Sequence, residues 1–281
     1  MAVVQEFHYR SVAPARGHFP GHHRSRSGDS GFEFRGHADL LDAPDPRRLD
    51  LHASLRDPFG GWIVRVYSQR QSIPVVMVAD LSASMAFEGR QRKLDVVADF
   101  AESLAWSAWR TGDSFGFIGC DSAVRSEWLL PQTRSRAAGS GIAQMLRGLQ
   151  ATGRSAQGLL DAHRHLPRQR ALVFLLSDFH LADADITTLL RSFAPHTLVP
   201  VVVWDRLEFG LSAPRGLVPV ADLESGRRRL VWWRPALREK WLAHHQAHRE
   251  ALMQQFGAQR LKPLFIEDGF EADAVTRHFH A

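Results

Sequence analysis

The chain has 281 residues, of which 44% are hydrophobic and 23% charged, a composition typical of a globular protein with a substantial core. Its formal net charge of +5 is modest and its arginines are scattered, so the charge does not indicate a nucleic-acid partner. No apolar stretch approaches the roughly 20 residues that a transmembrane helix needs, and we therefore expect no membrane span.

The start of the chain and its cysteine content bear on where the protein works. The first residues lack the apolar stretch of about 7–15 residues that a signal peptide requires. The lone cysteine, Cys120, excludes an internal disulfide and reads as a core residue at the end of a strand. We therefore expect a cytoplasmic protein.

The first 70 residues differ in pattern from the rest of the chain. Residues 1–70 are rich in Gly, Arg, His, Asp and Pro, which predicts an N-terminal arm with short strands. Within it, residues 62–69 alternate apolar and polar side chains and predict a strand with one wet face, at an edge or in a hairpin.

From residue 73 onward the sequence predicts a parallel sheet covered on both faces. Four continuous apolar runs, at 73–80, 113–120, 171–178 and 197–204, read as buried strands. Between and beside them, helices are predicted at 92–110, 136–149, 155–166 and 184–193, the last capped by Asp183. In the first helix, Lys93 falls off the apolar stripe. The fold class is therefore α/β, with a doubly wound, mostly parallel sheet.

After Trp204 the pattern changes again. A turn at 224–226 between two short apolar runs predicts a β-hairpin, followed by a long helix at 236–256. A short strand at 262–268 and a terminal helix at 270–279 complete the chain. We divide it into an arm (1–70), a central domain (71–206), and a hairpin with helices packed on that domain (207–281).

Polar side chains follow two of the predicted buried strands. Asp80 ends the first run and Asp178 ends the third, and ligands collect at such strand ends in open parallel sheets. Ser82 and Ser84 follow Asp80 at steps of two, and Ser155 lies in a loop ahead of a predicted helix. Carboxylate and hydroxyl oxygens suit Mg²⁺ or Mn²⁺. These five residues are the predicted metal ligands.

The same serines and aspartate also have a structural interpretation. An Asp-x-Ser-x-Ser segment after a strand makes a good turn and helix cap, because these side chains bind backbone amides. Three histidines, His244, His245 and His248, lie on a predicted helix with the first and last one turn apart. Without a third ligand in the pattern, we interpret them as a solvated or snorkelling helix face.

Three segments together resemble a known domain. "DLSASM", "RSAQGLLDA" and "VFLLSDF", within residues 72–204, resemble the von Willebrand factor A domain. The resemblance implies a metal-ion-dependent adhesion site formed by an Asp-x-Ser-x-Ser loop, a threonine loop and a strand-end aspartate. Ser155 stands where such a site usually has threonine.

The flanking segments extend the resemblance over nearly the whole chain. The segment "GHHRSRSGDSGFEFRGHADLLDAPDPRRLDLHASLRD" before the domain, with "DRLEFGLSAPRGLVPVADLESGRRRLVWW" and "LREKW" after it, resembles the bacterial family called domain of unknown function 58. Members are typically encoded beside MoxR-type AAA+ ATPases. The resemblance thus implies a MoxR-type ATPase, or a client protein that it remodels, as the partner.

The favoured function is therefore metal-dependent protein–protein interaction, an adaptor that binds a partner carboxylate through Mg²⁺ and performs no catalysis. Three alternatives stay open: an interaction domain that works without metal, a hydrolase or phosphotransferase that uses the metal to activate water, and a basic nucleic-acid module. The sequence leaves the oligomeric state open.

Overall fold

The computed structural model describes residues 4–10, 20–24, 33–68, 70–209, 216–221, 228–267 and 269–280. The chain forms two compact units, a smaller one of residues 11–73 and a larger one that joins residues 1–10 to 74–281. The division into 1–70, 71–206 and 207–281 stays a prediction.

The smaller unit is built on an antiparallel hairpin. Strand β3 (Ile63–Ser68) pairs with β2 (Glu33–Asp39), which confirms the strand predicted at 62–69. Helix α1 (Leu51–Arg56) is capped by Asp50, whose carboxylate accepts hydrogen bonds from the amide of Ala53 and from Arg65. The unit also contains η1 (Pro46–Arg48) and a second strand pair, β1 (Pro20–Arg24) with β4 (Arg70–Gln71).

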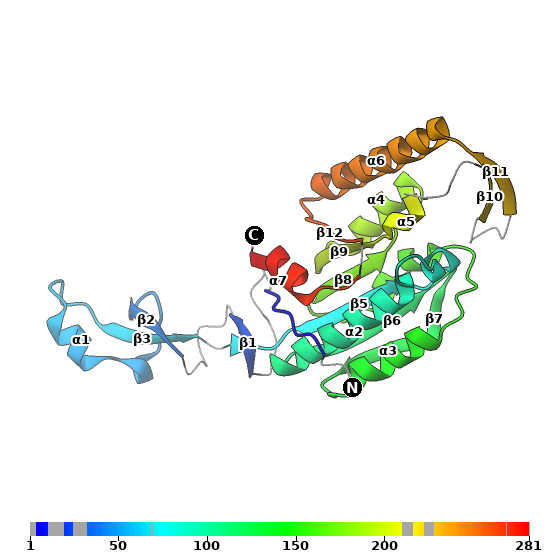
Figure 1. Ribbon diagram of the computed structural model, residues 1–281. Coiled ribbons are helices and arrows are strands. Elements are labelled where there is room, and N and C mark those ends of the chain that lie inside the picture. Colours follow the sequence, from blue (N-terminus) through cyan, green and yellow to red (C-terminus); the bar gives the residue numbers. More distant parts are fainter. Residues whose placement is uncertain are drawn as a thin grey trace. The chain divides into compact units, whose positions relative to one another are not determined.

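The larger unit contains a six-stranded sheet in the order β12-β9-β8-β5-β6-β7 (Figure 1). Only the β6–β7 pair within it is antiparallel. The strands are β5 (Pro74–Asp80), β6 (Ser114–Cys120), β7 (Val124–Thr133), β8 (Leu172–Ser177), β9 (Thr197–Val203) and β12 (Leu264–Ile266). Numbered within the sheet alone, this is the doubly wound order 3-2-1-4-5-6 read from the β7 edge. The predicted fold class is confirmed.

Both faces of the sheet are covered by helices, because the central strands are apolar on both sides. On β8, Phe174 contacts Phe100 of α2 and Phe279 of α7, whereas its neighbours Val173 and Leu175 join the apolar cluster of α4 and α6. The helices are α2 (Lys93–Arg110), α3 (Ala138–Gly148), α4 (Asp183–Ser192), α5 (Arg206–Phe209), α6 (Pro235–Ala258) and α7 (Ala272–His280). None of the helices in the described part of the chain is both long and apolar enough to cross a membrane.

Two local predictions are wrong. Residues 155–166 form two 3₁₀ turns, η3 (Gln157–Leu160) and η4 (Ala162–His165), rather than one α-helix. The amide of Gly158 binds the carbonyl of Asp121, and the glycine packs so closely on Ala123 that a Cβ would lie 2.4 Å from its carbonyl carbon. Asp183 does not cap α4 either, since it is the first helical residue and Ala182 occupies the cap position.

The first residues of the chain pack into the larger unit. Phe7 is buried against Phe100 and Phe174, and its amide binds the hydroxyl of Ser107. Tyr9 donates a hydrogen bond to Asp113. These residues therefore close the sheet face that α2 and α7 cover.

A hairpin leads into the long helix α6. Strands β10 (Gly216–Ala221) and β11 (Arg228–Trp233) pair antiparallel, as predicted, and the turn predicted at 224–226 lies outside the described residues. Neighbouring tryptophans face opposite sides: Trp233 is buried and stacks edge-on against Trp241 of α6, whereas Trp232 is exposed.

Candidate metal centre

The carboxyl ends of β5 and β8 lie side by side, because these strands pair in parallel. Asp80 is the last residue of β5, and Asp178 directly follows β8. Both carboxylates are almost completely buried, as are Ser82 and Ser177. Two acids and two hydroxyls are thus brought to one point at the sheet edge, as the strand-end pattern predicts.

The Asp80 loop is held by short hydrogen bonds. The carboxylate of Asp80 accepts from the amide of Ser82 at 2.9 Å and from the hydroxyl of Ser177 at 2.7 Å. The hydroxyls of Ser82 and Ser84 lie 3.1 Å apart. The bond to the Ser82 amide is the Asx-type turn that the structural interpretation predicts. The segment therefore forms the turn and also gathers three oxygen-bearing side chains.

The loop that carries Ser155 lies beside the Asp80 loop. Ser82 and Gly153 form a parallel bridge, and the amide of Ala83 binds the carbonyl of Gly153 at 2.8 Å. A Cβ on Gly153 would lie 2.5 Å from Cβ of Asp121, so glycine is needed for this approach. Ser155 follows two residues later and is half-buried. The structure thus brings its loop to the cluster, with Ser155 at the margin.

Burial sets the charge of Asp80. Burial and the negative charge of Asp178 raise the pKa of Asp80 to about 7, although hydrogen bonds from Ser82 and Ser177 oppose the rise. A nearby cation would hold this carboxyl ionised. The site therefore has a carboxyl poised between its neutral and charged forms near neutral pH.

Lys93 lies at this site, where the sequence analysis placed it off the buried stripe of α2. That prediction is wrong: Lys93 is buried, and its ammonium lies 3.2 Å from Asp178 and 2.8 Å from Glu208. Burial alone would lower the pKa of Lys93, but the two carboxylates together hold it above its ordinary value. Burial would raise the pKa of Asp178, but the charges of Lys93 and His180, together with hydrogen bonds from Ser84 and the His180 amide, hold it below its ordinary value.

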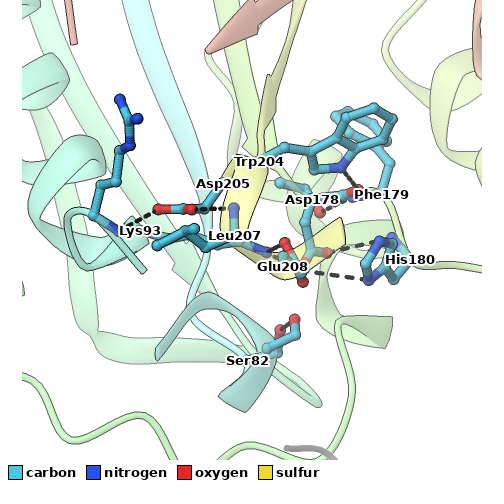
Figure 2. Close-up of polar contacts among 12 residues, drawn as sticks. Ser82, Lys93, Asp178, Phe179, His180, Trp204, Asp205, Leu207 and Glu208 are labelled. Atoms are coloured by element: carbon cyan, nitrogen blue, oxygen red, sulfur yellow. Dashed lines mark hydrogen bonds and ion pairs between the residues drawn. The ribbon is translucent and has the colours of Figure 1, made fainter. Parts of the chain in front are cut away.

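Glu208 and His180 are further site residues that sequence reasoning missed. Glu208 lies on α5, directly after β9, and burial raises the pKa of its carboxyl. His180 follows Asp178 by two residues, and its Nδ1 lies 3.8 Å from the Asp178 carboxylate. Figure 2 shows this imidazole directed toward Asp178 and Glu208. A signal was available, because both residues stand within five positions after a predicted buried strand.

The backbone around Asp178 is fixed by its neighbours. Phe179 adopts a left-handed conformation with φ of 55°, its amide binds the hydroxyl of Ser177, and its side chain is buried. The indole of Trp204 donates to the carbonyl of Asp178 at 2.9 Å. These contacts turn the chain sharply at the strand end, so Asp178 and His180 both reach the cluster.

Two of the three α6 histidines pack against residues near the strand-end cluster. His245 and His248 pack against Trp204, with ring centroids 4.5 Å and 5.8 Å from its ring, and His248 also lies beside His180. Burial lowers the pKa of His245 to about 4 and lowers that of His248 as well. His245 and His248 are therefore partly buried rather than fully solvated, whereas His244 is exposed.

The donor set fits a hard divalent cation. Asp80, Ser82, Ser84 and Asp178 offer oxygen atoms only, and Mg²⁺ and Mn²⁺ prefer such ligands. At this edge of the sheet, the buried carboxylates of Asp80 and Asp178 are accompanied by a buried ammonium, that of Lys93. The ammonium pairs with Asp178 and Glu208. Asp80 is the acid whose charge a bound cation would balance.

Comparison with known proteins places the chain in a family. Residues 44–251, more than half of the chain, match the family described as "Protein of unknown function DUF58". The chain belongs to the DUF58 family. The match confirms the resemblance drawn from the sequence, and it spans residues on both sides of the strand-end cluster.

A curated relative and two solved structures are similar to this DUF58 chain. The relative, "Uncharacterized protein in moxR 3'region" of Paracoccus denitrificans, is 38% identical over 79 residues, which are 28% of this chain and 70% of the relative. BatB of Bacteroides thetaiotaomicron is 12% identical with a TM-score of 0.44, covering 74% of this chain and 98% of BatB. Proximal thread matrix protein 1 of the mussel byssus, whose MIDAS motif is described as zinc-occupied, is 15% identical with a TM-score of 0.35, covering 47% of this chain and 38% of that protein.

Proposed function

We propose that this DUF58 protein is an adaptor that binds a partner protein through a cation at the strand-end cluster. The proposed ligands are Asp80, Ser82, Ser84, Ser155 and Asp178, and the cation is Mg²⁺ or Mn²⁺. The observation that supports this most strongly is the meeting of two buried carboxylates and two serine hydroxyls at one sheet edge. A carboxylate of the partner would be the outside ligand.

The protein's own side chains would prepare the site. Ser177 and the Ser82 amide orient the Asp80 carboxylate, and Lys93 holds Asp178 ionised. A bound Mg²⁺ supplies positive charge, and because three of the five proposed ligands are neutral serines, it retains attraction for an outside acid. The rigid strand ends fix these groups before a partner arrives.

The proposed partner is a MoxR-type AAA+ ATPase or a client protein of it, with both in the cytoplasm. The name of the Paracoccus relative places that relative in a moxR 3' region, which supports the pairing. We include no nucleic acid among the partners, because the net charge is small. The role is binding rather than catalysis.

A capture experiment tests this proposal. Purified MoxR-type ATPase from the same organism is passed over immobilised wild-type protein, Ser82→Ala and Ser140→Ala, all at fixed Mg²⁺ so that the ATPase keeps its own cofactor. Ser140 is exposed on α3 and serves as the matched serine control. Capture by wild type and Ser140→Ala, with loss in Ser82→Ala, is expected. Equal capture by all three would contradict a cation bridge.

Lys93 supports a second candidate, adaptor binding without metal. Its ammonium already joins Asp178 to Glu208, so an incoming carboxylate could replace Glu208 at the ammonium. Under this alternative, Ser82→Ala would keep capturing the ATPase and Lys93→Met would not. His180 beside Asp178 supports a third, a metal-assisted hydrolase. Release of p-nitrophenol from a phosphate ester that is lost in His180→Ala would favour that alternative.

A further inference from the structure

A second group of ligand-type side chains contains Asp178 and none of the serines. Asp178, His180 and Glu208 each offer one ligand atom, and these atoms all lie within 4.8 Å of one another. They come from the loop after β8 and from α5, the segment after β9 (Figure 2). Adjacent parallel strands thus deliver an imidazole and two carboxylates to one place.

The chemistry of this group differs from that of the serine cluster. An imidazole with two carboxylates is a mixed nitrogen and oxygen set, which suits Zn²⁺, Co²⁺ or Ni²⁺ better than Mg²⁺. Nδ1 of His180 lies 3.8 Å from Oδ2 of Asp178, so small side-chain rotations would bring these atoms to the distances of about 2 Å at which a metal binds. His180 keeps about a third of its side chain exposed, which leaves an entry path.

A further donor lies beside His180 on α6. The ring centroids of His180 and His248 are 5.4 Å apart. Nε2 of His248 is buried, and no group in the described part of the chain forms a hydrogen bond with it. Buried polar atoms normally have a partner, so this nitrogen is an independent sign of a missing ligand.

Lys93 is compatible with a metal at this place. Its ammonium contacts Oδ2 of Asp178 and Oε2 of Glu208, which leaves the second oxygen of Glu208 for another ligand. It also offsets one of the two negative charges, so a divalent ion would face one net negative charge if both imidazoles are neutral. The two carboxylates are therefore held near each other before any metal binds.

We propose that Asp178, His180 and Glu208, with His248 as the fourth ligand, form a binding site for a Zn²⁺-class ion. His248 is not among the residues whose ligand atoms lie within 4.8 Å of one another, so its ring would turn toward the ion, which would then join the strand ends to α6 and satisfy the buried nitrogen of His248. This site shares only Asp178 with the proposed Mg²⁺ site, and it does not depend on that proposal.

Cobalt is a suitable probe, because Co²⁺ accepts the same ligands and absorbs visible light. Untagged protein is titrated with CoCl₂, and Zn²⁺ affinity is then measured by competition. Wild type should bind one Co²⁺ per chain, and His180→Ala, Glu208→Gln and His248→Ala should each weaken binding by about tenfold or more, the scale on which even supporting residues of metal sites act. His163→Ala, on η4, is the matched histidine control and should bind as wild type does.

The outcomes are distinguishable. Co²⁺ affinity in His180→Ala and Glu208→Gln equal to that of wild type, or no Co²⁺ binding by wild type, would overturn the site. Unchanged affinity in His248→Ala would overturn the assignment of the fourth ligand. Ser82→Ala should retain Co²⁺ and lose Mg²⁺, whereas His180→Ala should do the reverse. Failure of either metal proposal therefore leaves a different pattern across these two variants.

Discussion

The ammonium of Lys93 lies 3.2 Å from the carboxylate of Asp178, and both groups are buried. The chain thus carries its own cation at the edge where the sequence predicts a metal. Because Lys93 compensates Asp178 and Glu208, Asp80 is left with hydroxyl and amide partners, and its pKa is raised. Asp178 and Glu208 therefore have a cation within the protein, whereas the charge of Asp80 would be balanced by a bound metal.

Replacing Lys93 should destabilise the fold strongly. Lys93→Met leaves the buried carboxylate of Asp178 and the partly buried one of Glu208 without their cation, and breaking a buried pair costs about 3–5 kcal/mol. Arg147→Met is the control, because Arg147 pairs with Asp99 and Glu102 at the surface, where an ion pair contributes about 1 kcal/mol or less. Urea unfolding measures both free energies. A loss in Lys93→Met no larger than that in Arg147→Met would show that the buried pair is not formed.

Stability without metal should fall as pH rises from about 4 to about 7. The folded pKa of Asp80 is raised to about 7, so the folded state binds its proton more tightly than the unfolded chain, and this contribution is lost at higher pH. In wild type we expect the free energy of unfolding to fall by on the order of 2–4 kcal/mol over this range, and Asp80→Asn should remove that fall. The low pKa of Asp178 acts oppositely, and its contribution is lost only as pH falls below about 4.

The measurement is urea unfolding of wild type and Asp80→Asn between pH 4 and pH 8 in chelator. Because both proteins contain the same histidines, the contribution of histidine titration cancels in the difference between their free energies of unfolding. Parallel pH profiles would contradict the raised pKa. Adding Mg²⁺ should flatten the wild-type profile and leave that of Asp80→Asn unchanged.

Gly153→Ala should weaken both the fold and Mg²⁺ binding. The new methyl group would lie 2.5 Å from Cβ of Asp121, and relieving such overpacking costs about 1–3 kcal/mol. The shift would also move the loop that pairs with Ser82. Gly141→Ala on α3 meets open space and should stabilise the protein by about 0.5–1 kcal/mol. Thermal unfolding with and without Mg²⁺ distinguishes the two variants. A shift of the melting temperature in the same direction in both would contradict the close packing of Gly153 on Asp121.

The two tryptophans of β11 should respond differently to truncation. Trp233→Ala removes a side chain that is 3% exposed and contacts Trp241, with an expected loss of about 3–5 kcal/mol. Trp232→Ala removes one that is 62% exposed, with an expected change within about 0.5 kcal/mol. Denaturant unfolding checks both, and a larger loss in Trp232→Ala would mean that the hairpin faces the other way.

The central strands and helices were predictable because their patterns are strong and local. Strand β5 lies within the predicted run 73–80, and α2 begins and ends within one residue of the predicted helix 92–110. Strand β7 was missed because Trp128 is its one fully buried residue, so it lacks both a continuous apolar run and a clear alternation, and it contains a proline. Its antiparallel edge position tolerates both features.

The site was predictable only in part. Asp80 and Asp178 meet because parallel strands end at one edge, and a sequence can show this. The burial of Lys93 could not be read from helical periodicity, since the first turn of α2 faces the strand ends rather than the sheet face. His180 and Glu208 could have been suspected because each closely follows a predicted buried strand, but no single-sequence pattern reports that His248 of α6 lies beside His180.

Calorimetric titration of Mg²⁺ into wild type, Ser82→Ala and Ser140→Ala tests the central claim most directly. The account predicts one Mg²⁺ per chain in wild type and in Ser140→Ala, and affinity at least about tenfold lower in Ser82→Ala, which loses a ligand oxygen. No Mg²⁺ binding by the folded wild type, or equal affinity in Ser82→Ala, would contradict it.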